Sequence, residues 1–187
     1  LVGSEMCIRD RAAVEAFYGA SYEKPLYDQA VHNGFQAVQS PGRLERVRTA
    51  PTVLLDACHN PHGAKALARA LDTCFEFNRL VGVLAILGDK DARGILEALE
   101  PVLDKVILTT NSSPRTLPVE DLAEIARQVF DAEQIDTAPT LADAIALATV
   151  EAENIDENGV MSGAGVIVTG SVVTAGEARS LFRKAPA

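Results

Sequence analysis

The feature that most constrains this chain is a regular alternation of apolar runs and amphipathic segments from residue 43 onward. The apolar runs have strand-like composition, and between them apolar residues recur at helical spacing. Strands that alternate with helices of about 10–15 residues form βαβ units, whose strands are parallel and whose crossovers are right-handed. We therefore expect an α/β fold, in which a doubly wound, mostly parallel, Rossmann-like sheet carries helices on both faces.

The individual elements follow from the same pattern. Runs that are apolar throughout predict strands buried on both faces, whereas alternating apolar and charged residues predict an edge strand or a half-exposed one. The expected strands are 44–48, which is either an edge strand or half-exposed, 52–56, 80–87, 105–109, a weak 134–137, and 166–169. The expected helices are 61–75, one after Asp91, one that starts at Pro118, one capped by Thr140, and 172–184. We expect an acidic, glycine-rich loop at 151–165.

The turn after the strand at 52–56 gathers polar residues. The apolar run stops at Asp56, and Asn60 and Pro61 suit the N-cap and the first position of the next helix. Asp56 and His59 are therefore expected at the carboxyl end of a strand, where open α/β sheets bind their ligands. Asp56 is suited to accept a hydrogen bond from a ribose hydroxyl or to hold a metal-bound water. A solvated acid that caps the turn explains it equally well.

The other residues of this turn have plainer explanations. The imidazole of His59 can donate to a carboxylate or a phosphate, but taken alone a partly exposed loop histidine explains it better. Cys58 lies near a helix N-terminus, which lowers a thiol pKa. However, no acid is placed beside the other histidines, and the chain has no CxxC motif. We therefore interpret Cys58 as a buried structural thiol and not as a nucleophile.

Two further positions offer groups to an anion. Arg43 follows a Pro-Gly turn signal, and a guanidinium at such a hinge can bridge two domains around a phosphate or carboxylate, although a surface arginine is the plainer interpretation. Ser171 opens the last helix with a hydroxyl and unpaired amides that suit an anionic group, and an ordinary N-cap explains it equally. Asp89, Lys90 and Asp91 either line the same crevice or form a solvated loop in which Asp91 caps the next helix.

Composition and missing motifs disfavour several classes of protein. The formal net charge of −9, with Lys and Arg scattered along the chain, argues against a nucleic-acid partner. No apolar run is long enough to span a bilayer, so we expect no membrane partner. The three cysteines form no metal pattern and favour a reducing, cytoplasmic setting. The chain has neither a GxxxxGK[ST] phosphate loop nor a GxGxxG after a strand, so dinucleotide binding is unsupported.

The first forty residues differ in pattern from the rest. Residues 1–11 look like translated sequencing-adapter read-through, and a frayed native N-terminus is the alternative. Residues 12–40 hold short helical segments at 12–17 and 29–38, which are too small to bury a core alone. We interpret them as the tail of an upstream domain followed by a linker. The α/β domain is expected at 41–187.

Four motifs occur in order along the chain: Pro41-Gly42-Arg43, LLDACHNPHGAKAL at 54–67, LGDKD at 87–91 and VTGS at 168–171. On these motifs the chain resembles the C-terminal domain of the folylpolyglutamate synthase/dihydrofolate synthase group within the Mur ligase family. The resemblance extends over residues 12–187 or so. Cys58 departs from the alanine that is usual there, which is a small change.

The resemblance implies an activity and a role for four residues. In the family, ATP phosphorylates a substrate carboxylate, and the amine of L-glutamate displaces phosphate from the acyl phosphate. Arg43 and Asp56 would contact ATP, while His59 and Ser171 would help to place the glutamate. The phosphate loop, the Mg²⁺ sites and most of the folate site belong to an N-terminal ATPase domain. No catalytic residue or metal ligand is therefore assigned here, and we expect this chain to be inactive alone.

Two hypotheses stay open on the sequence. The first is this ligase fragment, a monomer whose small-molecule ligands are ATP, L-glutamate, and a reduced folate or dihydropteroate or both. The second is a stand-alone, flavodoxin-like or receiver-like module that binds a small anion. A nicotinamide-dependent enzyme is disfavoured because the glycine motif is absent.

Overall fold

The computed structural model describes residues 29, 33, 40–153 and 163–183. The chain divides into two compact units, Leu1–Ser40 and Pro41–Ala187. In the first unit, Gln29 and Asn33 are helical, and the Gln29 side-chain amide donates to Asn33 Oδ1 at 2.8 Å. The expectations for 1–11, for a helix at 12–17 and for most of 29–38 lie outside the described residues, as do 154–162 of the acidic loop and residue 184.

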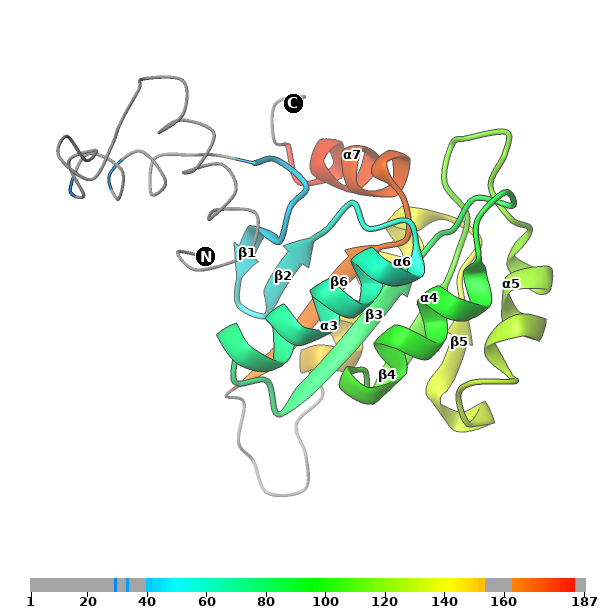
Figure 1. The fold of residues 1–187 in the computed structure, drawn as a ribbon, viewed down its shortest axis with the longest axis horizontal. Helices are drawn as coiled ribbons and strands as arrows, with labels where there is room; N and C mark the ends of the chain where they lie inside the picture. The colour runs from blue at the N-terminus through cyan, green and yellow to red at the C-terminus, as the bar shows by residue number, and fades with distance from the viewer. Residues whose placement is uncertain (1–28, 30–32, 34–39, 154–162, 184–187) are drawn as a thin grey trace, which may run out of the picture. The chain divides into compact units, whose positions relative to one another are not determined.

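A six-stranded sheet forms the centre of the second unit (Figure 1). Its strands are β1 (Glu45–Thr49), β2 (Thr52–Leu55), β3 (Arg79–Leu84), β4 (Lys105–Leu108), β5 (Ile135–Thr137) and β6 (Ala164–Thr169). In space their order is β1-β2-β6-β3-β4-β5. Strands β2 to β6 are parallel, and β1 pairs antiparallel with β2 at one edge. This confirms the mostly parallel α/β sheet and the edge position of the first strand.

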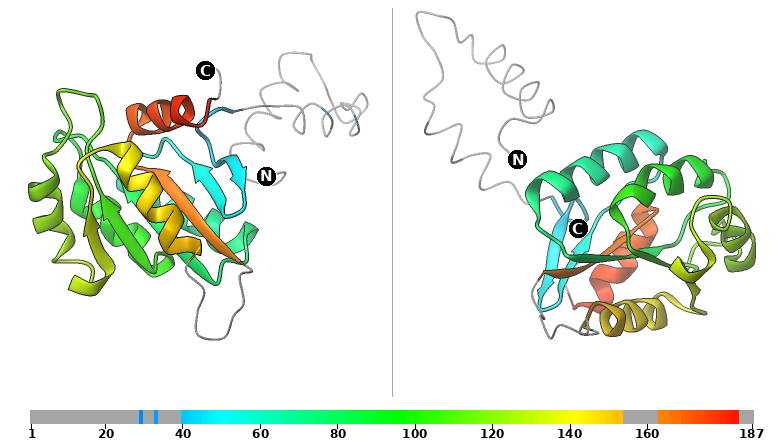
Figure 2. Two further views of the ribbon diagram at one scale, coloured as in Figure 1. Left: turned by 180° about the vertical axis from the view of Figure 1, so that it is seen from behind. Right: turned by 90° about the horizontal axis from the view of Figure 1, so that it is seen from below.

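Helices cover both faces of the sheet (Figures 1 and 2). The helices are α3 (Pro61–Cys74), α4 (Ala92–Leu99), α5 (Val119–Ala126), α6 (Leu141–Glu153) and α7 (Val172–Leu181), with short 3₁₀ turns η1 (Glu100–Val102) and η2 (Ala132–Gln134). Helices α3, α4 and α5 contribute to one apolar core, and α6 and α7 to the other. The expected doubly wound arrangement is therefore confirmed.

Each central strand supplies both cores because alternate side chains point to opposite faces. Leu54 and Ile167 lie in the core under α3, α4 and α5, and Val53 and Val168 lie in the core under α6 and α7. All four residues are at most 1% exposed. Burial on both faces explains why these strands are apolar throughout and do not alternate with polar residues.

The element boundaries differ from the expectation at several places. Strand β3 ends at Leu84 and not at Leu87, because the chain leaves the ladder and Leu87 instead forms an antiparallel bridge with Thr116. Helix α5 begins one residue later than expected, with Pro118 at its N-cap. Helix α6 extends into the expected loop, β6 begins two residues early, and α7 ends at Leu181. Apolar composition indicates burial, but it does not indicate hydrogen bonding between strands. It therefore predicts too long a strand where a buried chain turns away from the sheet.

The strand order creates a topological switch point. Strand β6 is the last in the chain but lies between β2 and β3. The helices after β2 and β3 cover one face of the sheet, whereas the helix after β6 covers the other. The connections therefore diverge at the carboxyl ends of these three strands, which is where ligands bind in open α/β folds. This edge contains the residues singled out in the sequence.

Candidate functional site

The turn between β2 and α3 has the predicted helix start. Asn60 is the N-cap, and its Oδ1 accepts from the Gly63 amide at 2.8 Å, while Pro61 occupies the first helical turn. The cap satisfies one of the amides that a helix start leaves unpaired. Asp56 and His59 lie in the irregular stretch just before it, at the carboxyl end of β2.

Asp56 is a buried acid whose carboxylate is fixed by two backbone amides. It is 9% exposed. Its Oδ1 accepts from the Cys58 amide at 2.8 Å, and its Oδ2 accepts from the Leu44 amide at 2.9 Å. Burial raises the pKa of Asp56 above 3.8, and these two hydrogen bonds and the positive charge of Arg43 oppose that rise. The acid is therefore not solvated, although it does close the turn through Cys58.

Arg43 is brought next to Asp56 by the loop that precedes β1. The Ala57 amide donates to Gly42 O at 2.7 Å, and Leu44 binds the Asp56 carboxylate, so the loop is joined to the β2 turn on both sides of Arg43. Arg43 itself is exposed, and no ion pair or hydrogen bond engages its side chain within the described residues. Its guanidinium is available to an anion at this edge.

His59 is half-buried, and its ring has a defined orientation. Its Nδ1 lies 3.0 Å from Ala57 O. A carbonyl oxygen accepts only, so this contact requires the proton on Nδ1. In the neutral ring Nε2 then carries the lone pair, and His59 can accept a hydrogen bond from a donor that approaches this turn.

Ser171 is the N-cap of α7 and belongs to a buried polar network. Its Oγ accepts from the Thr174 amide at 3.0 Å and from Asn111 Nδ2 at 3.2 Å. Asn111 Nδ2 also lies 3.0 Å from Thr174 Oγ1, and the Thr174 hydroxyl donates to Ala85 O at 2.8 Å. Both acceptor positions of Ser171 are thus used. Its Oγ also lies 2.8 Å from Thr174 Oγ1, and because the Thr174 proton is donated to Ala85 O, the Ser171 hydroxyl is the donor in this pair.

The four predicted site residues therefore share one edge but form two groups. Arg43 and Asp56 are linked through Leu44, and His59 follows in the same turn. Ser171 is on the neighbouring strand's turn, and in the described part of the chain no hydrogen bond joins it to the other three. At 1% exposure its hydroxyl is also less accessible than the sequence suggested.

Sequence reasoning missed Asn111 and Thr174. Asn111 is 7% exposed and follows β4, so its place after a buried strand was a usable signal. Thr174 occupies the first turn of a helix, where nothing in the sequence distinguishes a buried hydroxyl from an exposed one. Together they connect the turns after β3, β4 and β6.

Gly170 and the loop at 89–91 complete the edge. Gly170 has φ +109, and a Cβ there would lie 2.7 Å from Ala85 O, so both the conformation and the space require glycine. Asp91 caps α4 by accepting from the Gly94 amide at 2.9 Å, which agrees with the interpretation that Asp91 caps the helix after this loop. Asp89 pairs with Lys90 at 2.9 Å, and this contact lowers the pKa of Asp89. Asp89 and Lys90 therefore bind each other, and Asp91 binds the start of α4.

Cys58 is a structural thiol. It is 3% exposed, and burial raises its pKa to about 11. The Thr169 hydroxyl opposes this rise in the pKa of Cys58, although within the described residues the buried Thr169 oxygen has no hydrogen-bond partner. A thiol with such a pKa is almost wholly protonated at neutral pH and is a poor nucleophile. The interpretation drawn from the sequence is confirmed.

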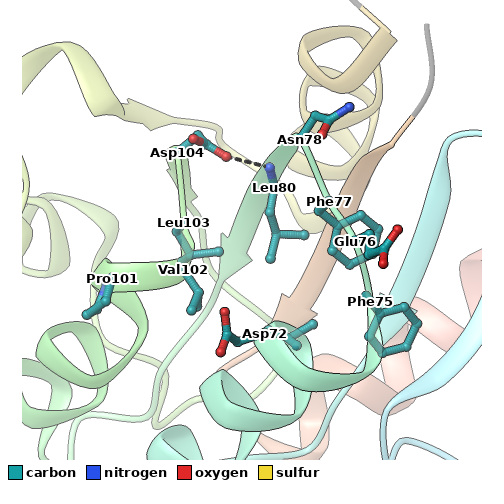
Figure 3. A pocket seen from close by; sticks show the side chains of 11 residues that line it. Asp72, Phe75, Glu76, Phe77, Asn78, Leu80, Pro101, Val102, Leu103 and Asp104 are labelled. Atoms are coloured by element: carbon teal, nitrogen blue, oxygen red, sulfur yellow. Dashed lines mark hydrogen bonds between the residues drawn. The ribbon is translucent and has the colours of Figure 1, made fainter.

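A separate cavity of about 300 Å³ lies near the amino ends of β3 and β4, next to the end of α3 and to η1 (Figure 3). Leu71, Leu80 and Leu103 form part of its lining. Figure 3 shows Asp72 on one side and Asp104 on another, and Asp104 Oδ2 accepts from the Leu80 amide at 2.6 Å. None of the predicted site residues lines this cavity.

The described residues contain no group of three His, Cys, Asp or Glu side chains able to hold a metal ion. They also contain no helix with the length and apolar character needed to cross a bilayer.

The fold and this edge can now be compared with known proteins. The family described as "Mur ligase, glutamate ligase domain" matches residues 42–172, and the chain belongs to this family. Within it, the chain is 52% identical over 180 residues to the dihydrofolate synthase/folylpolyglutamate synthase of Mycobacterium tuberculosis. That alignment covers 94% of this chain and 37% of the relative, in its C-terminal portion.

Solved structures agree with this assignment. The structure of Mycobacterium tuberculosis folylpolyglutamate synthase complexed with ADP matches with a TM-score of 0.87 and 53% identity, over 94% of this chain and 39% of that one. A bifunctional folylpolyglutamate synthase/dihydrofolate synthase from Yersinia pestis, complexed with AMPPNP and a Mn ion, matches with a TM-score of 0.70 and 27% identity, over 85% of this chain and 35% of that one. The resemblance seen in the sequence motifs is confirmed.

Proposed function

We propose that this chain is the C-terminal part of an ATP-dependent amide ligase that adds L-glutamate to a folate, with dihydropteroate as the other candidate acceptor. The observation that carries the proposal is the family match over residues 42–172, because it includes Arg43, Asp56, His59 and Ser171. ATP supplies the chemistry by phosphorylating the acceptor carboxylate, and glutamate then displaces phosphate from the acyl phosphate. The chain spans 37% of its Mycobacterium tuberculosis relative, so we propose that it is inactive alone.

Arg43 and Asp56 are the proposed ATP contacts. The exposed Arg43 guanidinium fits a phosphate oxygen, since it forms no ion pair in the described residues. Each Asp56 oxygen accepts one backbone amide and retains one further acceptor position, which fits a hydroxyl donor such as ribose. Because Asp56 is 9% exposed, a group can bind it only by coming close to the carboxyl end of β2.

His59 and the start of α7 are the proposed glutamate contacts. With Nδ1 turned to Ala57 O, the neutral ring of His59 offers Nε2 to an N–H donor, which fits the glutamate amine. Both acceptor positions of Ser171 are used and its proton is donated to Thr174, so its hydroxyl can serve a ligand only as a donor, which fits a carboxylate oxygen and not an amine. The hydroxyl would have to turn from Thr174 to make this contact.

Mg²⁺ is the other cofactor of the proposed reaction. The described residues contain no group of three His, Cys, Asp or Glu side chains able to hold a metal ion, and the roles proposed for Arg43, Asp56, His59 and Ser171 involve no metal. We propose that Mg²⁺ and the phosphates of ATP are held mainly by an N-terminal ATPase domain. The alternative function, a stand-alone module for a small anion, is less well supported because the family match includes three of the four motifs in full and Gly42-Arg43 of the first.

The first experiment assays ATP-dependent addition of glutamate to a reduced folate and to dihydropteroate. Two proteins are compared, namely the 187-residue chain and a chimera that joins it to the N-terminal part of the Mycobacterium tuberculosis enzyme. We expect no product from the chain and product from the chimera. Activity of the isolated chain would contradict its proposed dependence on another domain, and a folded but inactive chimera would contradict the ligase proposal.

The second experiment separates the two pairs of contacts. In the chimera, Asp56→Ala is expected to raise the KM for ATP, and His59→Ala the KM for glutamate. His62→Ala is the matched control, because His62 is an exposed histidine one turn away on α3. The assignments fail if Asp56→Ala leaves the KM for ATP unchanged, or His59→Ala that for glutamate.

A further inference from the structure

We propose that Glu45 and Arg179 form a clamp that sets the conformation of the Pro41–Leu44 loop and thereby the position of Arg43. They are positioning residues, since neither is assigned to a ligand. The proposal rests on the function proposed above only in naming ATP as the ligand of Arg43. The clamp itself follows from hydrogen bonds, backbone angles and packing around the loop.

The carboxylate of Glu45 joins the loop to α7. Its Oε2 accepts from the Gly42 amide at 2.9 Å and from Arg179 Nε at 2.7 Å. The Glu45 and Arg179 side chains are 20% and 12% exposed. A charge-assisted bond that is shielded from water in this way is stronger than a surface pair. The Gly42 amide is therefore linked through Glu45 to Arg179, which lies 134 residues after Glu45 in the chain.

The loop is also held on its other side. Gly42 O accepts from the Ala57 amide at 2.7 Å, and the Leu44 amide donates to Asp56 at 2.9 Å. Both neighbours of Arg43 thus have fixed backbones, whereas the Arg43 side chain is exposed. This arrangement presents a long cationic side chain from a rigid base and reduces the entropy lost when a ligand binds.

The backbone of the loop needs these bonds. Gly42 has φ +66 and Leu44 has φ +47, so Arg43 lies between two left-handed residues. Glycine adopts this region readily, but leucine does so only where its surroundings impose it. Such imposed conformations concentrate at binding sites. Release of the clamp would let Leu44 relax toward an ordinary extended or helical conformation and would move Arg43.

The helix at the far end of the clamp is itself fixed. Thr174 in its first turn donates to Ala85 O, and its N-cap Ser171 is bonded to Asn111. Arg179 lies in the last turn of the same helix. Helix α7 therefore connects the base of Arg43 with Ser171, so both groups of the candidate site depend on one helix for their placement.

Amide hydrogen exchange in the full chain tests the clamp directly. Arg179→Gln is expected to accelerate exchange at the Gly42 amide by about tenfold or more. Without the Arg179 guanidinium the Glu45 carboxylate is held less firmly, so its hydrogen bond with the Gly42 amide opens more often. Arg48→Gln is the matched control. Arg48 lies on β1, the edge strand that also carries Glu45, and its guanidinium pairs with Glu153 at 2.9 Å, away from the loop. Exchange at Gly42 that is unchanged in Arg179→Gln, or equally faster in Arg48→Gln, would overturn the proposal.

A conservative variant separates positioning from loss of the fold. Arg179→Lys keeps the charge but loses the Nε donor, and we expect an intermediate exchange rate at Gly42 and protection in β3 like that of the wild type. If Arg179→Gln fails to fold, Arg179→Lys carries the test. Wild-type exchange at Gly42 in Arg179→Lys would then overturn the clamp.

Kinetics in the chimeric ligase connect the clamp to ATP. We expect Arg179→Gln to raise the KM for ATP about tenfold, with a smaller change in kcat and no change in Arg48→Gln. An unchanged KM for ATP in Arg179→Gln, in a chimera where Arg43→Gln does raise it, would overturn the link to Arg43. If Arg43→Gln leaves that KM unchanged while exchange at Gly42 is accelerated in Arg179→Gln, the clamp stands and the ATP contact proposed for Arg43 fails.

Discussion

The carboxylate of Asp56 and the backbone amide of Leu44 are joined at 2.9 Å across twelve residues of sequence. This bond connects the turn after β2 to the loop that carries Arg43. Asp56 therefore holds the loop in place and is also a candidate ligand contact. A variant of Asp56 changes both the position of the loop and the contact with the ligand.

Replacement of Asp56 by asparagine should destabilise the fold. Asparagine has one acceptor oxygen where two amides, from Cys58 and Leu44, now bind. One buried amide would lose its partner and face an NH₂ group, at a cost of about 1–3 kcal/mol. Denaturant unfolding measures this loss. Asp72→Asn is the control, because Asp72 is exposed on α3, and there we expect a change within about 0.5 kcal/mol.

Titration of Asp56 should occur above its ordinary range. Burial raises its pKa above 3.8 in the folded chain. A proton therefore binds the folded state more tightly than the unfolded state. The stabilisation that this proton gives is complete below pH 3.8, the pKa of the unfolded chain, and it is lost as the pH rises through the higher pKa of the folded chain. NMR of the carboxyl carbon gives the midpoint. Arg43→Gln should raise it further, because the Arg43 charge lowers it. A midpoint below 3.8 would mean that the hydrogen bonds outweigh burial.

The two described cysteines should differ in reactivity. Cys74 is exposed, whereas Cys58 is buried with a pKa of about 11. At pH 8, three units lower, about one Cys58 thiol in a thousand is ionised. Iodoacetamide should therefore modify Cys74 and spare Cys58 in the native chain, as mass spectrometry can report. Unfolding in denaturant serves as the control and should make both react. Rapid modification of native Cys58 would contradict its structural role.

Loss of the Asn111 side chain should weaken the end of the sheet where α7 begins. Asn111→Ala removes donors to Ser171 and Thr174 and the acceptor of the Ser113 amide. We expect a loss of about 1–3 kcal/mol in the free energy of unfolding. Ser112→Ala is the neighbouring control, since that side chain is exposed. Equal stability of Asn111→Ala and wild type would show that water replaces the network.

Two glycine-to-alanine changes should act in opposite directions. A Cβ at Gly165 would lie 2.8 Å from Cδ1 of the Phe77 ring, so Gly165→Ala should cost about 1–3 kcal/mol. A Cβ at Gly176, within α7, meets nothing within 4 Å, so Gly176→Ala should stabilise by about 0.4–1 kcal/mol. Thermal unfolding compares them. Phe77→Leu should offset part of the Gly165→Ala loss if the ring is its cause.

Much of the fold was predictable because burial leaves a direct record in composition. Strands such as β3 and β6 are apolar throughout, and the caps at Asn60, Asp91 and Ser171 are polar residues just before amphipathic runs. The errors are at element ends. There the chain stays buried while its hydrogen-bond partner changes, as between Leu84 and Leu87, and composition does not register that change.

The candidate site was predictable to the level of residue and edge. Strand ends in a parallel sheet meet at one side, which is why Asp56 and Ser171 could be assigned to the same crevice. Their environments were not predictable, because each depends on partners far away in sequence. Leu44 binds Asp56 from 12 residues away, and Asn111 binds Ser171 from 60 residues away.

The sequence by itself therefore determined the α/β class, the starts of α3, α4, α6 and α7, the family and the identity of the candidate residues, because these rest on local spacing and motif. Only the tertiary structure decided that Ser171 is buried in a polar network, that Asp56 is held by two amides, and that Arg43 lies on a loop bound through Glu45 to Arg179. The Asp56–Leu44 bond arises from the pairing of β1 with β2, and the other two properties arise from the insertion of β6 between β2 and β3, which brings together groups that no local pattern relates.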